Sequence, residues 1–409
     1  MKVEKMKSIS PEKIEVSIIG AGRMGTGIAQ VFSQKGMNVC LVDISDEALE
    51  RAREKIEEGF ESLRKKGILE SFQASEAKQR VFTTSSYEEA CLGKNLKLVI
   101  ESAEEDEETK KMIFSELQRL CPEGVILCST TSSLDVESFT REINRSEGII
   151  WMHFFFPANE SRAVEYAGSS QVSLEDLERG EDYLKLAGKE PVRLQKFRRG
   201  GSTWIICSAL MLEATRMLDD GFDVLSIEEA GKEAFELPFG FLRLMEKSGI
   251  FHSVVTMNSF SGSSNPSDQI FKTYENFFTP SQSCRRKLVE YEKSQDESKL
   301  FWLSEEVEGR KSEDFMLVEI LKQRFLAVSF MTACEVVNAG VARMRDVDRL
   351  CQLALSFKEG PFSLMNRMGI RKAMEIVTER MELSHRREIN FPIPEILIAQ
   401  VQKNEPWPI

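Results

Sequence analysis

The stretch that decides the fold of this chain is VSIIGAGRMGTGIAQVFSQKGMNVCLVD, residues 16–43. An apolar, β-branched run over residues 14–19 predicts a strand, and the glycine-rich residues 20–25 predict a tight turn that opens a helix. A second strand is expected over residues 38–42, and it ends in Asp43. Short apolar runs then continue to alternate with polar helical stretches. This alternation predicts βαβ units and a parallel sheet.

The glycine spacing in this stretch is GxGxxG, and it stands directly between a strand and a helix. Gly20 would permit the tight turn, Gly22 would let a pyrophosphate approach the backbone, and Gly25 would allow close contact between helix and strand. The helix N-terminus offers N–H groups to phosphates. Asp43 can accept both ribose hydroxyls and would repel a 2′-phosphate, so the pattern predicts NAD rather than NADP. A structural turn with a capping aspartate is the alternative. The expected cofactor-binding residues are Gly20, Gly22, Arg23, Met24, Gly25 and Asp43.

Composition excludes several classes of protein. The chain has 409 residues, a formal net charge of −12 and 42% hydrophobic residues, which predicts several globular domains. An acidic surface without a dense Lys/Arg stripe argues against nucleic-acid binding. Eight singly scattered cysteines and three histidines leave little for a metal site, so we expect no metal and buried free thiols in a reducing compartment. The longest apolar run is too short for a membrane span, and the N-terminus lacks a signal-peptide core, so we expect a cytoplasmic protein.

After about residue 196 the pattern becomes helical, as over residues 205–218 and 318–339. This part also repeats itself, with packing as the simplest meaning of each shared residue. Seven residues recur 119 or 120 positions later: Ala214, Gly221, Gly240, Leu244, Met245, Gly249 and Ile250 as Ala333, Gly340, Gly360, Leu364, Met365, Gly369 and Ile370. The polar stretches 257–269 and 295–314 are expected to be loops or a linker.

The predicted fold is therefore an α/β Rossmann-like dinucleotide-binding domain followed by two related all-α domains. The expected boundaries are residues 1–198, 199–315 with a linker, and 316–409.

Ser132, His153 and Glu165 are the candidate catalytic residues, expected at strand ends and loops on the carboxyl side of the sheet. Oxidation of an alcohol by NAD requires a base for the hydroxyl proton, and a histidine suits this task. A carboxylate on its far nitrogen would fix the tautomer, and a serine hydroxyl could align the substrate oxygen. From spacing alone, the alternative is a histidine packed in the core.

Four segments together resemble the 3-hydroxyacyl-CoA dehydrogenase family. They are the stretch quoted above, CSTTSSL, MHFFFPANESRAVEY and PFGFLRLMEKSGI, which occur in the family's order and extend the resemblance over nearly the whole chain. The resemblance implies an NAD domain followed by helical domains that dimerise or, in longer members with a second helical copy, form a pseudo-dimer. It also implies an acyl-CoA substrate.

The resemblance assigns roles to individual residues. The family's catalytic histidine falls on His153, its partner glutamate on Glu165 and its substrate-contacting serine on Ser132. Its acid and lysine beside the dinucleotide fall on Glu105 and Lys110. Its lysine near the coenzyme A phosphates falls on Lys66. Without the resemblance, the last three residues would be taken for a solvated helix face.

The chain departs from the family where amides surround the reacting carbon. Thr130 stands for an asparagine in STTS, Phe156 stands for another in HFFFP, and in GGSTWII a third is replaced by Ser202, Thr203 or Trp204. A serine near the coenzyme A in some members is Gly59 here. Loss of these donors would slow turnover on standard substrates. Aromatic replacements suit a bulky or ring-bearing acyl group.

Two main hypotheses and one minor one remain open. The first is an NAD-dependent (3S)-3-hydroxyacyl-CoA dehydrogenase of fatty acid β-oxidation type with an atypical acyl group. The second is a catalytically impaired NAD- or acyl-CoA-binding subunit that pairs with an active partner. The third is a dehydrogenase of free hydroxy acids, in which Lys66 would have no role in binding.

Overall fold

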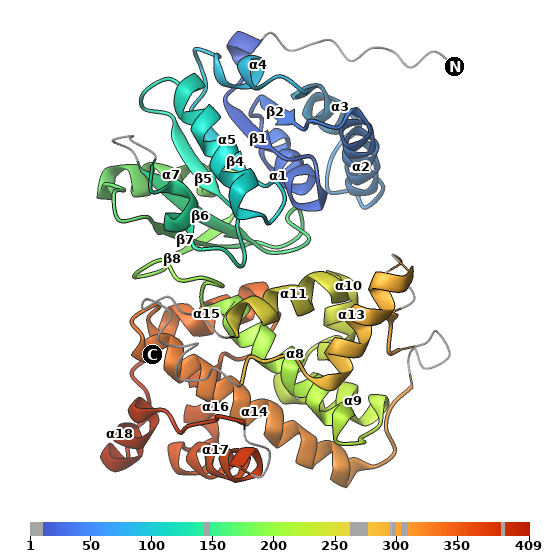
Figure 1. Ribbon diagram of the computed structural model, residues 1–409, viewed down its shortest axis with the longest axis vertical. Coiled ribbons are helices and arrows are strands. Elements are labelled where there is room, and N and C mark those ends of the chain that lie inside the picture. The colour runs from blue at the N-terminus through green and yellow to red at the C-terminus, as the bar shows by residue number, and fades with distance from the viewer. Residues whose placement is uncertain are drawn as a thin grey trace. The chain divides into compact units, whose positions relative to one another are not determined.

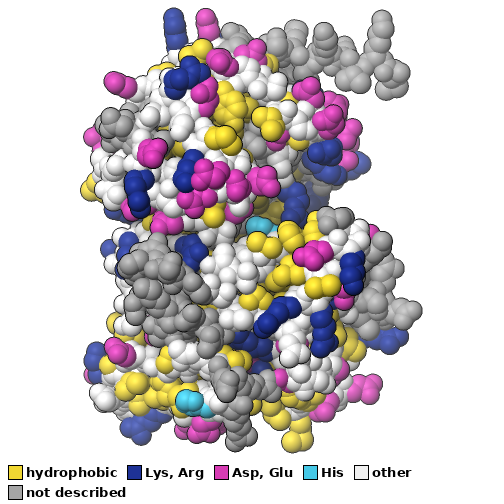
Figure 2. All heavy atoms as spheres, viewed as in Figure 1, with side chains coloured by type: hydrophobic (Ala, Val, Ile, Leu, Met, Phe, Trp, Pro, Cys, Tyr) yellow, Lys and Arg dark blue, Asp and Glu magenta, His cyan; other side chains and the backbone are white. Residues whose placement is uncertain are grey.

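The computed structural model describes residues 11–142, 148–261, 277–294, 296, 300–303, 310–385 and 389–409. The chain divides into two compact units, Met1–Arg193 and Leu194–Ile409 (Figure 1). On the face shown in Figure 2, acidic and basic side chains are interspersed. Among the described helices, none has the length and hydrophobicity that crossing a bilayer requires.

The first unit is built on a mixed sheet. Within the described residues this sheet has eight strands in the order β3-β2-β1-β4-β5-β6-β7-β8. Neighbouring strands are parallel except for the antiparallel pair β6 and β7. The strand order reverses between β1 and β4, which creates the switch point where open α/β sheets bind their ligands. The strands are β1 Val16–Ile19, β2 Val39–Val42, β3 Val81–Thr84, β4 Leu98–Glu101, β5 Ile126–Ser129, β6 Ile149–Phe154, β7 Ala163–Gly168 and β8 Glu190–Arg193.

Helices cover both faces of this sheet. A buried apolar cluster joins alternate strand residues, including Ile18 and Met152, to α1, α2, α3 and α7. On the other face, Ser17 donates to Ala90 of α4, and α5 packs against both α4 and α6. Because strand side chains alternate, His153 points away from the cluster that holds Met152. The helices are α1 Arg23–Gln34, α2 Asp46–Lys65, α3 Ser71–Gln79, α4 Tyr87–Cys91, α5 Glu107–Leu120, α6 Val136–Thr140 and α7 Leu174–Leu186, after a short 3₁₀ turn at Pro11–Lys13.

In the described part of the second unit, the regular secondary structure consists of helices. The long helix α14 packs against α8, α9 and α17, and most residues of α8 and α14 are buried. The helices are α8 Thr203–Asp219, α9 Val224–Phe235, α10 Phe241–Ser248, α11 Ile250–Phe260, α13 Gln282–Ser294, α14 Phe315–Asn338, α15 Met344–Ala354, α16 Pro361–Met368, α17 Ile370–His385 and α18 Glu395–Lys403.

One loop expectation is wrong at its start. Residues 257–260 continue helix α11, because Val254, Met257 and Phe260 are buried at helical spacing and extend its apolar face. The rest of that expected loop, residues 262–269, lies outside the described residues, as does most of 295–309.

Residues paired by the sequence repeat adopt matching conformations. Gly249 and Gly369 precede α11 and α17 with φ of 100° and 92°. Glu228 accepts hydrogen bonds from the backbone at the start of α10, and Asp348 does the same at the start of α16. The duplication itself stays a prediction.

Candidate functional site

The turn between β1 and α1 has the geometry that a dinucleotide requires. Gly20 has a φ of +110°, and a Cβ there would lie 2.4 Å from the carbonyl oxygen of Ser102. A Cβ on Gly25 would lie 1.9 Å from the Gly20 oxygen. By contrast, nothing lies within 4 Å of a Cβ built on Gly22. Gly20 and Gly25 therefore serve close packing, while Gly22 leaves the backbone open to a ligand.

A cavity of about 620 Å³ opens beside this turn. Gly20, Gly22 and Asp43 line it, together with residues that follow β4, among them Ser102 and Glu104. The Asp43 carboxylate accepts from the backbone N–H groups of Ala21 (2.8 Å) and Ser45 (2.9 Å), so its position at the end of β2 is fixed. Two of the three predicted glycines, Gly20 and Gly22, thus meet the predicted acid at one cavity at the sheet's switch point.

The three candidate catalytic residues also come together. Ser132 Oγ lies 3.2 Å from His153 Nε2, and His153 Nδ1 lies 3.4 Å from Glu165 Oε2. His153 and Glu165 are directly opposed across the antiparallel pair β6 and β7. Glu165 is fully buried and lies in the middle of strand β7 rather than at a strand end or in a loop. The strand register therefore positions the carboxylate behind the imidazole.

Glu105 holds the turn that carries Ser132. Its Oε1 accepts from four donors, namely Thr131 Oγ1 (2.6 Å), Ser132 N (2.8 Å), Ser133 N (2.7 Å) and Ser133 Oγ (2.9 Å). Burial raises the pKa of Glu105, but the Lys110 ammonium and these hydrogen bonds outweigh it and hold that pKa below its ordinary value. Since Glu104 lines the cavity, this segment joins the cavity to the Ser132 turn.

Lys110 is buried rather than solvated. Its side chain is 1% exposed, and its Nζ lies 2.6 Å from Glu101 Oε1 and 3.5 Å from Glu105 Oε2. Glu101 also accepts from Ser129 Oγ at 2.6 Å and from Ala103 N at 2.8 Å. This charged network connects the carboxyl ends of β4 and β5 to α5.

Sequence reasoning missed Glu101 and Trp151. Trp151 stacks on His153 with ring centroids 5.4 Å apart, and its Nε1 donates to the Thr131 carbonyl at 2.8 Å. Strand periodicity could have found it, because Trp151 stands two residues before His153 on the same face. Glu101 could have been found because it is an acid that directly ends the apolar run of residues 98–100.

The remaining candidates are Lys66, Gly59, Thr130, Phe156 and the residues at the start of α8. Lys66 is an exposed residue at the C-terminal end of α2. Gly59 faces α1, where an added Cβ would lie 2.5 Å from Gln30 Nε2. Thr130 donates its N–H to the Glu101 carbonyl, and Phe156 is 46% exposed. Ser202, Thr203 and Trp204 belong to the second unit, at the start of α8.

Comparison with known proteins identifies the family. The family model described as "3-hydroxyacyl-CoA dehydrogenase, NAD binding domain" matches residues 15–197, and that described as "3-hydroxyacyl-CoA dehydrogenase, C-terminal domain" matches residues 321–405. The mitochondrial hydroxyacyl-coenzyme A dehydrogenase of Homo sapiens is 30% identical over 250 residues, which are 59% of this chain and 79% of that protein. The chain belongs to the 3-hydroxyacyl-CoA dehydrogenase family.

Other members are similar to different extents. A 3-hydroxybutyryl-CoA dehydrogenase of Clostridioides difficile is 29% identical over 60% of this chain and 86% of its own length. The crystal structure of (S)-3-hydroxybutyryl-CoA dehydrogenase from Ralstonia eutropha has 27% identity and a TM-score of 0.59, with 68% of this chain and 93% of that one covered. That of 3-hydroxybutyryl-CoA dehydrogenase from Escherichia coli has a TM-score of 0.78 at 20% identity. It covers 96% of this chain and 99% of that one, and shows that the whole fold is shared.

This family member is an NAD-dependent oxidoreductase, and its own residues fit the cofactor. The packed Gly20, the open backbone at Gly22 and the fixed carboxylate of Asp43 all meet at the cavity described above. NAD supplies the acceptor for a hydride when it is bound. Among the described residues, no group of three or more His, Cys, Asp or Glu side chains could hold a metal ion.

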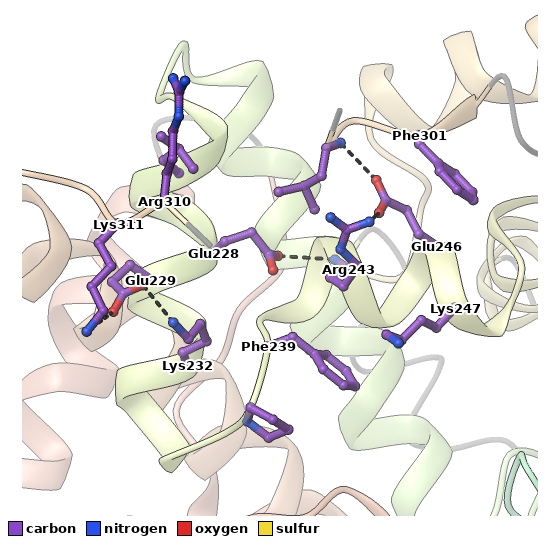
Figure 3. Close-up of a pocket in the computed structure, with 13 residues that line it drawn as sticks. Glu228, Glu229, Lys232, Phe239, Arg243, Glu246, Lys247, Phe301, Arg310 and Lys311 are labelled. Atoms are coloured by element: carbon purple, nitrogen blue, oxygen red, sulfur yellow. Dashed lines mark hydrogen bonds and ion pairs between the residues drawn. The ribbon is translucent and has the colours of Figure 1, made fainter. Parts of the chain in front are cut away.

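A second cavity, of about 410 Å³, lies in the helical unit of this dehydrogenase (Figure 3). Its acids already have partners within the unit. Glu228 accepts from the backbone at the start of α10, Glu229 pairs with Lys232 at 2.9 Å, and Glu246 pairs with Arg243 at 3.0 Å. Glu228 thereby joins α9 to α10, and the other two pairs each lie within one helix. Because these acids already have local partners, we place the chemistry at the glycine turn instead.

Proposed function

We propose that the chain oxidises a (3S)-3-hydroxyacyl-CoA to the 3-oxoacyl-CoA, with reduction of NAD and release of one proton. The observation that carries this proposal is the arrangement of Ser132, His153 and Glu165 in one chain of contacts on the sheet of the NAD domain. Relatives named as 3-hydroxyacyl-CoA and 3-hydroxybutyryl-CoA dehydrogenases support the substrate class.

In this proposal His153 is the general base. Its Nε2 takes the proton of the substrate hydroxyl, and Ser132 Oγ, 3.2 Å from that nitrogen, holds the same oxygen. Glu165 faces the other ring nitrogen, so it directs the proton-accepting nitrogen toward Ser132 and stabilises the imidazolium. The 3.4 Å separation between Nδ1 and the carboxylate exceeds a normal hydrogen bond, and such contacts often tighten when substrate binds.

Burial supports the same roles. The imidazole lies between Trp151, which stacks on it, and Phe155, whose ring centroid lies 4.9 Å away. These rings exclude water from the charged pair, which strengthens the attraction between imidazolium and carboxylate.

We propose further that the acyl group is bulky or ring-bearing. Thr130 and Phe156 stand where the family has amides, so the part of the site next to His153 offers fewer donors and more apolar surface. Lys66, exposed at the end of α2, would contact the coenzyme A phosphates. Lys66→Ala should therefore raise KM for the thioester, and an unchanged KM would favour a free hydroxy acid as substrate.

The deciding experiment measures NADH absorbance with a panel of short, long, branched and ring-bearing (3S)-3-hydroxyacyl-CoA thioesters. His153→Gln should lower kcat by about 10²- to 10⁴-fold on the best substrate. His385→Gln, an exposed histidine on α17, is the matched control and should leave the rate unchanged. An undiminished rate in His153→Gln would remove the mechanism.

The second candidate function is a catalytically impaired subunit that binds NAD or acyl-CoA and pairs with an active partner. The replaced amides at Thr130 and Phe156 favour it. Binding of NADH and thioesters to the folded protein without turnover of any panel member would support this function over the first.

The proposal also covers the domain arrangement, the oligomeric state and the location of the protein in the cell. We take the helical part as two related copies, residues 199–315 and 316–409, that mediate a homodimer or form a pseudo-dimer. Light scattering after size-exclusion chromatography would distinguish these two states. Eight buried free cysteines suit a reducing cytoplasm, which cell fractionation would test.

A further inference from the structure

Helix α1 and the loop after β6 are joined by a row of contacts. The guanidinium of Arg23 lies over the Phe156 ring, 5.1 Å from its centroid. One turn further along α1, a Cβ on Gly27 would lie 3.1 Å from the Ala158 Cβ. The next turn brings Gln30 Oε1 within 3.1 Å of Asn159 Nδ2. Arg23, Gly27 and Gln30 are spaced i, i+4 and i+7, so one face of α1 is matched in order to this loop.

Arg23 stands at the cofactor end of this row. It directly follows Gly22, whose backbone is open to a ligand, and it is the first residue of α1. Gly22 gives no side-chain cap to the helix, and the first turn contains no acid. The helix N-terminus and Arg23 therefore present positive charge together beside an exposed glycine turn, where a diphosphate is stabilised.

Phe156 is an unusual neighbour for this charge. It is 46% exposed, although it follows the buried Phe154 and Phe155. A flexible arginine on a helix surface samples many rotamers, and ordering it costs conformational entropy when an anion binds. An aromatic face below the guanidinium restricts that motion and attracts the cation. The close approach of Ala158 to Gly27 fixes the loop, and this in turn fixes the position of the Phe156 ring.

We propose that Phe156 is a positioning residue for NAD: it holds the Arg23 guanidinium in place for the cofactor's diphosphate. Arg23 makes the contact with the diphosphate, and Phe156 acts through Arg23. The Arg23–Phe156 pair thereby links the loop after β6 to the turn that receives the cofactor. This role concerns cofactor affinity and is separate from the proposed acyl preference and from the proposed base.

The test measures NADH binding to the whole chain by fluorescence titration and calorimetry, without any acyl-CoA. Phe156→Leu keeps an apolar side chain but removes the aromatic face, and should raise the NADH Kd about two- to fivefold. Arg23→Met should raise it about ten- to a hundredfold, because a charge-assisted contact is lost. The double variant should bind no more weakly than Arg23→Met. Phe156→Tyr should restore the wild-type Kd.

Two ligand fragments separate this role from others. ADP-ribose, which carries the diphosphate, should show the Phe156→Leu and Arg23→Met losses, whereas adenosine should show neither. Phe72→Leu, an exposed phenylalanine on α3, is the matched control and should bind NADH normally. Unchanged NADH affinity in Phe156→Leu, or additive losses in the double variant, would overturn the proposal. The proposal would also be overturned if Phe156→Leu weakened the binding of free coenzyme A, or of a thioester with a carboxylated acyl group, while NADH affinity stayed unchanged.

Discussion

Two regions of this molecule bury charge in different ways. In the helical unit, Glu213 of α8 accepts from Arg324 Nε at 2.6 Å and from Arg380 at 2.8 Å and 2.6 Å, so both its oxygens are bonded. Arg324 also pairs with Asp220 at 2.7 Å. In the NAD unit, the contacts of His153 with Ser132 and Glu165 are 3.2 Å and 3.4 Å long.

The difference separates a structural charge cluster from the row that we propose to be catalytic. The Glu213 cluster joins α8, α14 and α17 with short bonds to a carboxylate that is fully buried. The row at His153 has longer contacts and ends at Ser132, which is half-buried. Buried charge therefore does not by itself indicate chemistry. We infer function where a titratable group has a carboxylate on one side and a less buried hydroxyl on the other, as His153 does.

Removal of charge from the Glu213 cluster, which we call the closed cluster because both carboxylate oxygens are bonded, should have the largest effect. That effect should be on stability. Glu213→Gln leaves Arg324 and Arg380 buried without their counter-charge, so we expect a loss of about 3–5 kcal/mol in the free energy of unfolding. Urea or thermal unfolding of the two proteins measures this loss. Glu319→Gln, an exposed position on α14, should change stability by less than about 0.5 kcal/mol. Equal stability of wild type and Glu213→Gln would mean that the cluster is not structural.

Removal of charge from the row Ser132, His153 and Glu165, which we call the open row, should lower turnover instead of stability. Glu165→Gln keeps the shape of the side chain but removes the charge behind His153, and should lower kcat about 10²- to 10³-fold, or about 3–4 kcal/mol in activation free energy. NADH affinity should stay unchanged. The rate is followed by NADH absorbance across pH, with Glu160→Gln, an exposed acid, as the control. A normal rate with a lowered melting temperature in Glu165→Gln would mean that Glu165 is structural rather than part of the proposed catalytic row.

Acid should weaken the closed cluster through one identifiable group. Burial raises the pKa of Glu213, but Arg324 and Arg380 outweigh it and lower that pKa from an ordinary value of 4.5 to about 2. The folded state therefore favours the carboxylate, and this stabilisation is complete above about pH 4.5 and is lost as the pH falls toward 2. We expect wild type to lose about 3 kcal/mol over this window from this group. Denaturant unfolding at several pH values should show a shallower slope for Glu213→Gln, and equal slopes would contradict the assignment.

The NAD unit is the part that sequence predicts well. The GxGxxG turn and Asp43 carry local geometric requirements, and Gly20, Gly22 and Asp43 line one cavity at the switch point. His153 and Glu165 are further apart in sequence, and the family resemblance links them. What sequence alone does not reveal is that β7 runs antiparallel to β6, which brings these two residues into register.

Long-range charge pairing was not predictable from local pattern. Glu213 is 111 residues from Arg324 and 167 from Arg380, and nothing in the surrounding helical periodicity indicates which charges will be buried together. Lys110 shows the same limit on a smaller scale. In sequence it belongs to a highly charged helix, yet the fold buries it against Glu101 at the end of β4.

Glu105 combines features of the structural cluster and of the proposed catalytic row. Its substitution should show the smallest effect on stability and turnover. Its Oε1 holds the Ser132 turn, as a structural group would, but the turn it holds carries the residue nearest His153. Glu105→Gln keeps an acceptor at this position and loses the attraction to Lys110, so we expect about a tenfold fall in kcat and about 1–2 kcal/mol of lost stability. Glu108→Gln, on the exposed face of α5, is the matched control.

The two readouts decide which kind of group Glu105 is. A fall in kcat together with an unchanged NADH Kd would mean that Glu105 acts on Ser132 through the turn. A raised NADH Kd with kcat retained at saturating NAD would instead mean direct contact with the cofactor, as the family resemblance implies. The four hydrogen bonds on Oε1 favour the first outcome, because a carboxylate oxygen with that many donors has little capacity left for a ligand. The second oxygen, 3.5 Å from Lys110, is the atom through which a cofactor contact could still be made.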